Sequence, residues 1–266
     1  MANIIELGQQ LAILLGLFLA AWGIERRKPV QRRALGAERF NFPCIVPYVA
    51  AHSLLGPGTA AMAVSVVNAM GGGWLVLADA RWALVPAFLL YALTQDGLEY
   101  GFHRAQHQCA GLWAMHSLHH SETAMAASTT FRHFWAEQLL KTMSIYLILG
   151  IVFKANSAIL GMSALLSYYN IFPHMNLRVG FGRWAAWLNS PQYHRIHHSS
   201  LPHHEGRNFA ALFPVFDVIF GTFLAPDKDS YPPTGLADGA APAGLFDALC
   251  WPARGALKRV LLRSRP

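Results

Sequence analysis

The residues of this chain that are best suited to chemistry are its histidines. The chain has 266 residues and 13 histidines, of which all but His52 lie at or between His103 and His204. Most fall into clusters spaced three and four residues apart, which places side chains side by side on one face of a helix. Each cluster can therefore direct two or three imidazoles at one point. The clusters are His103 and His107; His116, His119 and His120; and His194, His197 and His198.

These clusters indicate a metal centre. Imidazole is the commonest neutral metal ligand, and a bound metal holds many histidines together without the repulsion that protonation would cause. His174 follows the last apolar stretch on the same predicted side and is a ninth candidate. Nine ligands exceed the six positions of an octahedral ion, which predicts a two-metal centre. Nitrogen ligands alone are compatible with iron, zinc or copper.

Four histidines are left out of this predicted ligand set: His52, His133, His203 and His204. His52 lies in an apolar stretch away from the clusters. His133 either orients the centre or faces water, and His203 and His204 fall in a predicted loop. Each of these positions is more typical of a packing or solvated histidine than of a ligand.

Polar residues near the clusters are candidates to hold the outer nitrogens of the ligand rings, because a ligating imidazole usually donates its second N–H to a carboxylate or carbonyl. Asp96 and Glu99 stand seven and four residues before His103, so helical spacing places them on or near its face. Glu99 has Arg104 as an alternative partner. The weaker candidates of the same kind are Asn176, Asn208 and Asp217.

The elements that must position these residues are predicted from five apolar stretches. They cover about residues 4–24, 44–69, 82–100, 139–153 and 157–172. A helix needs about 20 apolar residues to cross a bilayer. The sequence therefore predicts an all-α fold, a polytopic membrane bundle of about four to five spans with a cytoplasmic helical cap that holds the histidine-rich dimetal centre.

Three regions follow from this pattern. Residues 1–101 would carry the first three spans, and residues 102–230 would form the histidine-rich region with a helical hairpin at 139–172 and the cap. Residues 231–266 would form a Pro/Gly/Ala-rich linker and a basic amphipathic tail at 245–263 that lies in the membrane interface.

The basic charge is explained by membrane orientation. With residues 26–39 in the cytoplasm, only Arg81 and Lys154 of the 21 lysines and arginines lie outside. The N-terminus would then be outside, with the metal site and C-terminus in the cytoplasm of a bacterial inner membrane or an endoplasmic-reticulum-type membrane. The net charge of +7 thus needs no nucleic-acid partner.

Composition excludes two further classes of protein. The 54% hydrophobic content against 13% charged residues excludes a disordered chain. The three cysteines, Cys44, Cys109 and Cys250, are scattered without a C-x-x-C pair, which excludes a thiolate metal site and a disulfide framework.

From about residue 96 to 223 the sequence resembles the fatty acid hydroxylase/sterol desaturase superfamily of integral membrane di-iron enzymes. The similar motifs are HRAQH at 103–107, HSLHHS at 116–121, FPHMN at 172–176 and HRIHHS at 194–199, with trailing segments at 208–209 and 217–223. One segment departs from the family pattern. Where the family often carries Arg-x-His-Pro-x-Glu, residues 132–137 read RHFWAE, with Phe134 and Trp135 in place of His and Pro.

The resemblance implies that two iron ions, held by the nine histidines, use O2 to hydroxylate or desaturate a membrane lipid such as a sterol or a fatty acyl chain. Zinc would be able to replace iron in a purified sample. No flavin or nicotinamide fingerprint is visible in the sequence, so electrons would come from a separate ferredoxin or a cytochrome b5-like donor with its reductase. We expect Arg183, Arg195 and Arg207 to dock this donor, and Phe181, Trp184 and Trp187 to line the lipid entrance.

Two other classes of function remain open at this point. A zinc-dependent lipid hydrolase would use three protein ligands and a general base, and would not depend on O2. A non-redox membrane protein that binds or transports a metal would distribute its ligands along a path through the spans, whereas only His52 lies outside the histidine-rich region.

Overall fold

The computed structural model describes residues 2–32, 40–77 and 83–253, and the regular secondary structure in these parts is helical, joined by long loops after residues 174 and 197. The longer helices are α1 (Ala2–Glu25), α2 (Asn41–Ala69), α3 (Leu84–Gln108), α4 (Ala110–His120) and α7 (Ser157–Tyr169). The shorter helices are α5 (Glu137–Lys141), α6 (Leu147–Val152), α8 (Ile171–His174), α9 (Pro191–His197), α10 (Val215–Ile219) and α11 (Leu245–Leu249). Single helical turns are η3 (Ala127–Phe131), η4 (Thr142–Tyr146), η5 (Gly182–Trp184) and η6 (Pro202–His204).

All five predicted apolar stretches are helical, and the all-α prediction is confirmed within the described residues. The prediction of four to five membrane spans is wrong: in the described parts of the chain, no helix combines the length and the apolar character that crossing a bilayer requires. In α7 the reason is length, because its 13 residues rise about 20 Å against a hydrocarbon core of about 30 Å. In α3 the apolar run ends at Thr94, since Gln95, Asp96 and Glu99 follow.

The predicted hairpin at 139–172 is present, and its turn has a defined cause. The side chain of Asn156 accepts a hydrogen bond from the backbone N–H of Ile159 at 2.9 Å, which caps the start of α7. Before the turn, the backbone N–H of Lys154 donates to the carbonyl of Leu75 at 2.8 Å. The segment after α2 therefore holds the tip of the hairpin in place.

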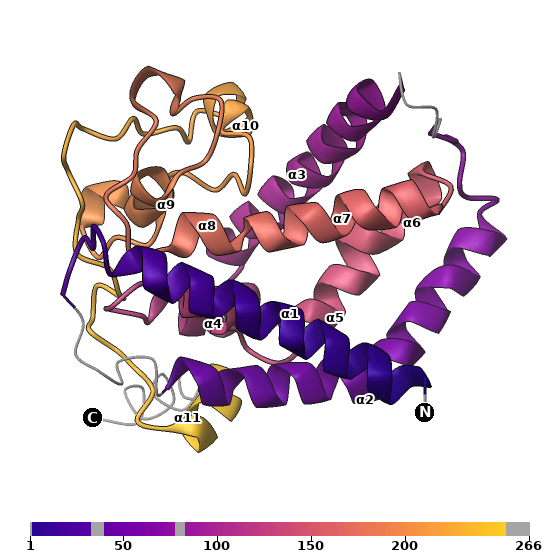
Figure 1. Ribbon diagram of the computed structural model, residues 1–266, viewed down its shortest axis with the longest axis horizontal. Helices are drawn as coiled ribbons and strands as arrows, with labels where there is room; N and C mark the ends of the chain where they lie inside the picture. The colour runs from indigo at the N-terminus through magenta and orange to yellow at the C-terminus, as the bar shows by residue number, and fades with distance from the viewer. Residues whose placement is uncertain (1, 33–39, 78–82, 254–266) are drawn as a thin grey trace, which may run out of the picture.

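The main core lies between α3 and this hairpin. Buried members include Tyr91 and Ala92 on α3, Leu149 on α6, and Ile159 and Leu166 on α7. At the other ends of these helices, α3 packs against α4 and α8 packs against α9. The helices α4, α8 and α9 lie towards one end of the molecule, away from the N-terminal end of α1 (Figure 1). The fold thus brings the four histidine-bearing segments together.

Several other predictions concern the ends and connections of the chain. The helix predicted at 245–263 begins as α11, while residues 254–266 lie outside the described residues. Cys44 is buried, whereas Cys109 and Cys250 are exposed, and all three are free thiols. The three domain boundaries, the orientation and the cellular location stay predictions.

Candidate metal centre

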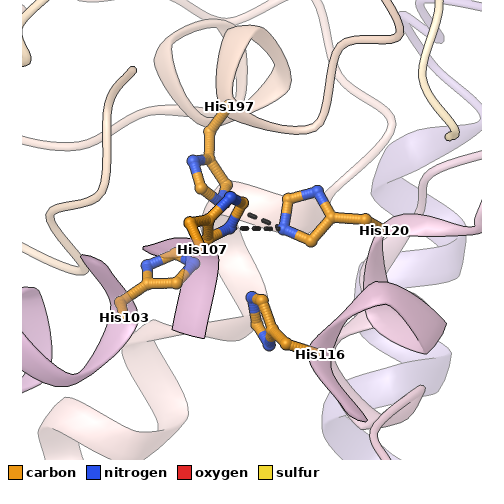
Figure 2. Close-up of side chains that lie close together, drawn as sticks. All are labelled: His103, His107, His116, His120 and His197. Carbon is orange, nitrogen blue, oxygen red and sulfur yellow. Dashed lines mark hydrogen bonds between the residues drawn. The ribbon is translucent and has the colours of Figure 1, made fainter. Parts of the chain in front are cut away.

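Five of the nine predicted ligands converge in one group. His103 and His107 come from α3, His116 and His120 from α4, and His197 from the end of α9, and Figure 2 shows their rings pointing towards one another. One nitrogen from each ring lies within 4.8 Å of those of the others. The Nε2 atom of His120 is 3.2 Å from that of His107 and 3.1 Å from that of His197.

The other four predicted ligands form a second group. His119 comes from α4, His174 from α8, and His194 and His198 from α9 and its C-terminal cap. The Nε2 atom of His174 is 3.1 Å from that of His119 and 3.0 Å from that of His194. The two groups adjoin, because the rings of His120 and His198 stack with centroids 4.3 Å apart. All nine predicted ligands are therefore brought together, as two neighbouring groups.

Backbone carbonyls orient three of the ligand rings. The Nδ1 atom of His103 is 2.8 Å from the carbonyl oxygen of Phe209. The Nδ1 atom of His197 is 2.9 Å from the carbonyl oxygen of Arg207, and the Nδ1 atom of His174 is 2.7 Å from that of Asn170. A carbonyl only accepts hydrogen bonds, so Nδ1 carries the proton in each ring. The lone pair is then on Nε2, which points into the group.

All nine rings are held neutral. Burial is the largest cause that lowers the pKa of each of the nine below its usual range. For His174 and His197 it lowers the pKa to about 3. The buried Nε2 atoms of His103 and His116 have no hydrogen-bond partner. Clustered lone pairs without protons are stabilised by a cation, so the residues present fit a two-metal centre.

Glu137 is a functional candidate that the sequence prediction missed. Its Oε2 atom lies 3.1 Å from Nδ1 of His116, 3.2 Å from Nδ1 of His133 and 2.8 Å from the amide nitrogen of Gln106. Burial would raise the pKa of this carboxyl, but His133 and His116 outweigh burial and hold the pKa well below its usual range. The signal was present in the RHFWAE segment, where Glu137 stands four residues after His133.

His133 lies beside the centre rather than in water. Its ring stacks on that of His119 with centroids 4.2 Å apart, and with His116 and Glu137 it forms a third group of potential ligands. His203 and His204 face each other at 4.2 Å and belong to neither histidine group. The side chain of His52 lies outside the described residues.

Two of the residues predicted to hold the outer nitrogens of the ligand rings instead fix the backbone that does so. Asp217 accepts hydrogen bonds from the N–H groups of Phe209 and Ala210 at 2.9 and 2.8 Å. Asn208 adopts a left-handed conformation with φ of 59° and accepts from the N–H of Leu224. Both hold the loop that presents the carbonyls of Arg207 and Phe209 to the ligand rings.

The other three predicted outer partners bind elsewhere. Asp96 accepts from the backbone N–H groups of Leu212 and Phe213 at 2.8 and 2.6 Å, and burial raises its pKa to about 7. Glu99 pairs with Lys141 at 2.7 Å instead of Arg104. The side chain of Asn176 accepts a hydrogen bond from the backbone N–H of Gln31 and donates one to its carbonyl.

A cavity of about 280 Å³ adjoins both histidine groups. Its lining includes His103 and His116 from the first group and His119, His174 and His194 from the second. A small molecule in this cavity would contact histidines of both groups.

The matched sequence family agrees with this geometry. The sequence model of the family described as "Fatty acid hydroxylase" matches residues 88–222, just over half of the chain. The chain belongs to the fatty acid hydroxylase family. The matched region contains all nine converging histidines and the cavity-lining part of α3.

Several relatives are named as monooxygenases or hydroxylases. The chain is 28% identical over 179 residues to an alkylglycerol monooxygenase of Caenorhabditis elegans, with 67% of this chain and 35% of that one aligned. It is 31% identical to an alkylglycerol monooxygenase of Danio rerio, with 57% and 32% aligned. It is 24% identical to the ornithine lipid hydroxylase OlsE of Rhizobium tropici, with 70% and 56% aligned. The chain thus spans about a third to just over half of these relatives, and no solved structure matches it significantly.

The departure from the family pattern at Phe134 and Trp135 does not reach the histidine groups. Phe134 is buried in an apolar cluster with Cys44, Leu118 and Trp251, and Trp135 packs against that cluster. The neighbouring Arg132 pairs with Glu122 at 3.0 Å. The departure thus lies in the packing next to α4, and Glu137 contacts His116.

Of the surface predictions, the one for Arg195 needs correction. None of Phe181, Trp184 and Trp187 lines the cavity, and both tryptophans are exposed, so their place at a lipid entrance stays a prediction. Arg195 is buried, and its guanidinium donates to the carbonyl of Pro232 at 2.8 Å. The reason is that α9, which carries Arg195, packs inside the molecule to present its histidines.

Proposed function

We propose that this chain is an O2-dependent lipid hydroxylase with an iron ion in each histidine group. The observation that carries the proposal is the pair of adjoining groups of neutral imidazoles, five and four in number, at one cavity. Relatives named for alkylglycerol monooxygenation and ornithine lipid hydroxylation support insertion of one oxygen atom over desaturation.

The chain's own residues bind and orient. The iron ions would activate O2, which supplies the chemistry that an unactivated C–H bond requires. His103, His174 and His197 keep Nε2 available because their Nδ1 atoms donate to carbonyls. Seven of the nine histidines are buried and two, His103 and His107, are partly buried, which limits the access of bulk water and protects a reactive site from side reactions.

Electrons would come from a separate ferredoxin or cytochrome b5-like protein. Arg183 is exposed and Arg207 is partly exposed, so both remain available to an acidic donor. Charge steering across such a contact speeds association and weakens with salt. Turnover driven by the donor should therefore fall as ionic strength rises.

The test is lipid mass spectrometry on cells grown under ¹⁸O2. Cells that express the intact chain should contain a lipid with one ¹⁸O atom, and cells with His197→Ala should not, because that variant loses a ligand of the first group. His203→Ala is the matched control, since His203 is exposed and belongs to neither group. Oxygen gained from water instead of O2 would contradict the proposal and favour a hydrolase. Purified protein should also contain two iron ions per chain.

A further inference from the structure

A tryptophan on α4 lies against the outer side of the first histidine group. The indole ring of Trp113 contacts the ring of His107, with centroids 4.9 Å apart, and the ring of His120, with centroids 5.5 Å apart. Those two histidine rings are neighbours themselves, since their Nε2 atoms are 3.2 Å apart (Figure 2). Trp113 therefore touches two candidate ligands, although it cannot ligate a metal itself.

The cavity lies on another side of this group. Its lining includes His103 and His116, but not His107, His120 or Trp113. The tryptophan is only partly buried, and it belongs to none of the hydrophobic clusters that the described residues form. Packing in a core therefore does not account for it, and a lipid in the cavity would leave it uncovered.

The surface next to Trp113 permits close approach by another protein. We call residues 108–111 the α3–α4 corner, because α3 ends at Gln108 and α4 begins at Ala110. All four residues of the corner are exposed, and three of them have small side chains. The backbone N–H of Trp113 donates to the carbonyl of Cys109 at 2.8 Å, so the indole lies within one helical turn of the corner.

Two arginines make the outside of the first group basic. Arg104 on α3 and Arg207 in the loop after α9 are both partly exposed. Arg104 donates to the hydroxyl of Tyr100 at 3.3 Å, and that hydroxyl bonds Thr222. Arg207 donates to the carbonyl of the adjacent Gly221 at 3.1 Å. The two guanidinium groups therefore lie at the same turn.

Acidic residues are sparse in these segments. None occurs between Glu99 and Glu122, a stretch that includes the histidines of α3 and all of α4. The exposed acid nearest to Arg207 in the sequence is Glu205. A face with a positive balance attracts an acidic partner and speeds its association.

The proposed reaction requires electrons from such a partner. Insertion of one atom of O2 into a C–H bond consumes two electrons and two protons, and the other oxygen atom leaves as water. Iron–sulfur and haem carrier proteins deliver one electron at a time, so each turnover requires two deliveries. The rate of electron transfer falls steeply with the width of the gap, and an aromatic ring in contact with the acceptor's ligands narrows that gap.

We infer that electrons enter the centre through Trp113, from an acidic one-electron carrier protein docked on the α3–α4 corner beside Arg104 and Arg207. Each docking oxidises the carrier by one electron and reduces one iron ion, while the indole mediates the transfer and ends unchanged. Because the cavity lies on another side, the carrier docks without displacing the lipid. This inference rests on the proposed hydroxylase function.

The test measures reduction without turnover. Oxidised, iron-loaded protein is mixed under nitrogen, without lipid, with reduced plant-type [2Fe–2S] ferredoxin, an acidic carrier whose absorbance rises as it is oxidised. Trp113→Leu should lower the rate at saturating ferredoxin about tenfold or more, because a gap replaces the ring contact. Trp113→Phe should keep most of the rate, since it retains an aromatic ring. Trp74→Leu is the matched control, because Trp74 is 63% exposed and lies outside both histidine groups.

Reduction by dithionite separates electron entry from a structural role. This small ion needs no docking site, so it should reduce Trp113→Leu as fast as the unsubstituted protein. Slower reduction by both reagents would show that Trp113 only maintains the metal centre, and would overturn the inference. An unchanged ferredoxin rate in Trp113→Leu would also overturn it. So would an unsubstituted protein that dithionite reduces but that neither ferredoxin nor the soluble domain of cytochrome b5 reduces.

Docking is measured with zinc-loaded protein, which binds ferredoxin without accepting electrons. Arg104→Gln/Arg207→Gln should raise the dissociation constant about threefold or more, and added salt should reduce the difference. Lys154→Gln is the control, because it removes a positive charge at the exposed tip of the hairpin. Equal affinity in the double variant and the control would overturn the docking site.

Failure of the proposed function gives a different result. Reduction that depends on Trp113, in a protein that adds ¹⁸O to no lipid, would retain the entry point and reject the lipid hydroxylase. A lipid that gains ¹⁸O equally with Trp113→Leu and with the unsubstituted protein would do the reverse.

Discussion

Several ligand rings are oriented by backbone carbonyls, which the spacing of residue types in a sequence does not reveal. Three bonded Nδ1 atoms use backbone carbonyls, at Arg207, Phe209 and Asn170. Glu137 differs, because it is a buried carboxylate that bonds a ligand ring directly through His116. Outer partners of this kind fix the ring and raise its basicity as a ligand. A conservative substitution of Glu137 can therefore test how much this carboxylate contributes to metal binding.

We expect Glu137→Gln to weaken iron binding by about 10- to 100-fold, the usual effect of changing an outer partner of a metal-bound histidine. The amide keeps the shape of the side chain but removes the charge that three donors share. Competition with a chelator measures the change in iron affinity. Glu205→Gln is the control, because it makes the same substitution at an exposed position. Equal iron affinity in both variants would show that Glu137 has only a packing role.

Among the single residues, the sequence predicted which histidines converge better than it predicted the groups that hold them. Eight of the nine were predictable because spacings of three and four fix which side chains share a helix face, and His174 followed from its place after an apolar stretch. Asp96 shows why those groups were not: it lies near the face of His103 by spacing, yet binds the backbone of residues 212 and 213. Such a partner depends on which loop folds against the helix, and helix spacing carries no information about that loop.

Among the elements, the hairpin of α5, η4, α6 and α7 connects the core to the cavity. Its buried residues Ile145, Leu149 and Ile159 pack with α3, and its polar residues Lys141 and Tyr146 line the cavity. The cap at Asn156 determines where α7 begins. Loss of this cap should therefore affect the whole hairpin.

We expect Asn156→Ala to lower the free energy of unfolding by about 1 kcal/mol, because the N–H of Ile159 loses its acceptor. Chemical denaturation with urea measures the change. Asn156→Asp should retain most of the stability, since aspartate also accepts this hydrogen bond. Equal stability of the alanine and aspartate variants would mean that water replaces the cap at no cost.

The positions of the helices were predictable from the apolar stretches, but their lengths were not. The stretch at 139–153 forms α5, η4 and α6 rather than one uniform helix. The sequence gives no clear sign of the π-helical turn η4, because it depends on packing around Lys141 and Tyr146. The prediction of membrane spans failed at two of the stretches for a related reason: α7 has only 13 residues, and Gln95, Asp96 and Glu99 end the apolar run of α3.

For the molecule as a whole, the buried histidines couple metal binding to stability. Nine imidazoles come together without charge in a buried centre, and burial lowers the pKa of each. In the unfolded chain the same groups titrate near pH 6.5. Below that pH the unfolded state binds more protons than the folded state, so stability falls as pH falls.

We expect the metal-free protein to unfold between about pH 6.5 and 5. Each histidine kept neutral in the folded state lowers the free energy of unfolding by about 1.4 kcal/mol for each pH unit in this range. The free energy of unfolding of a whole domain is only about 5–15 kcal/mol. A few of the nine are therefore enough to unfold it. Bound iron should move the transition to lower pH, because the metal competes with protons for the same nitrogens. Circular dichroism across the pH range, with and without iron, measures both transitions. His203→Ala should leave them unchanged, and a metal-free protein that stays folded at pH 4.5 would contradict the neutral, buried state of the rings.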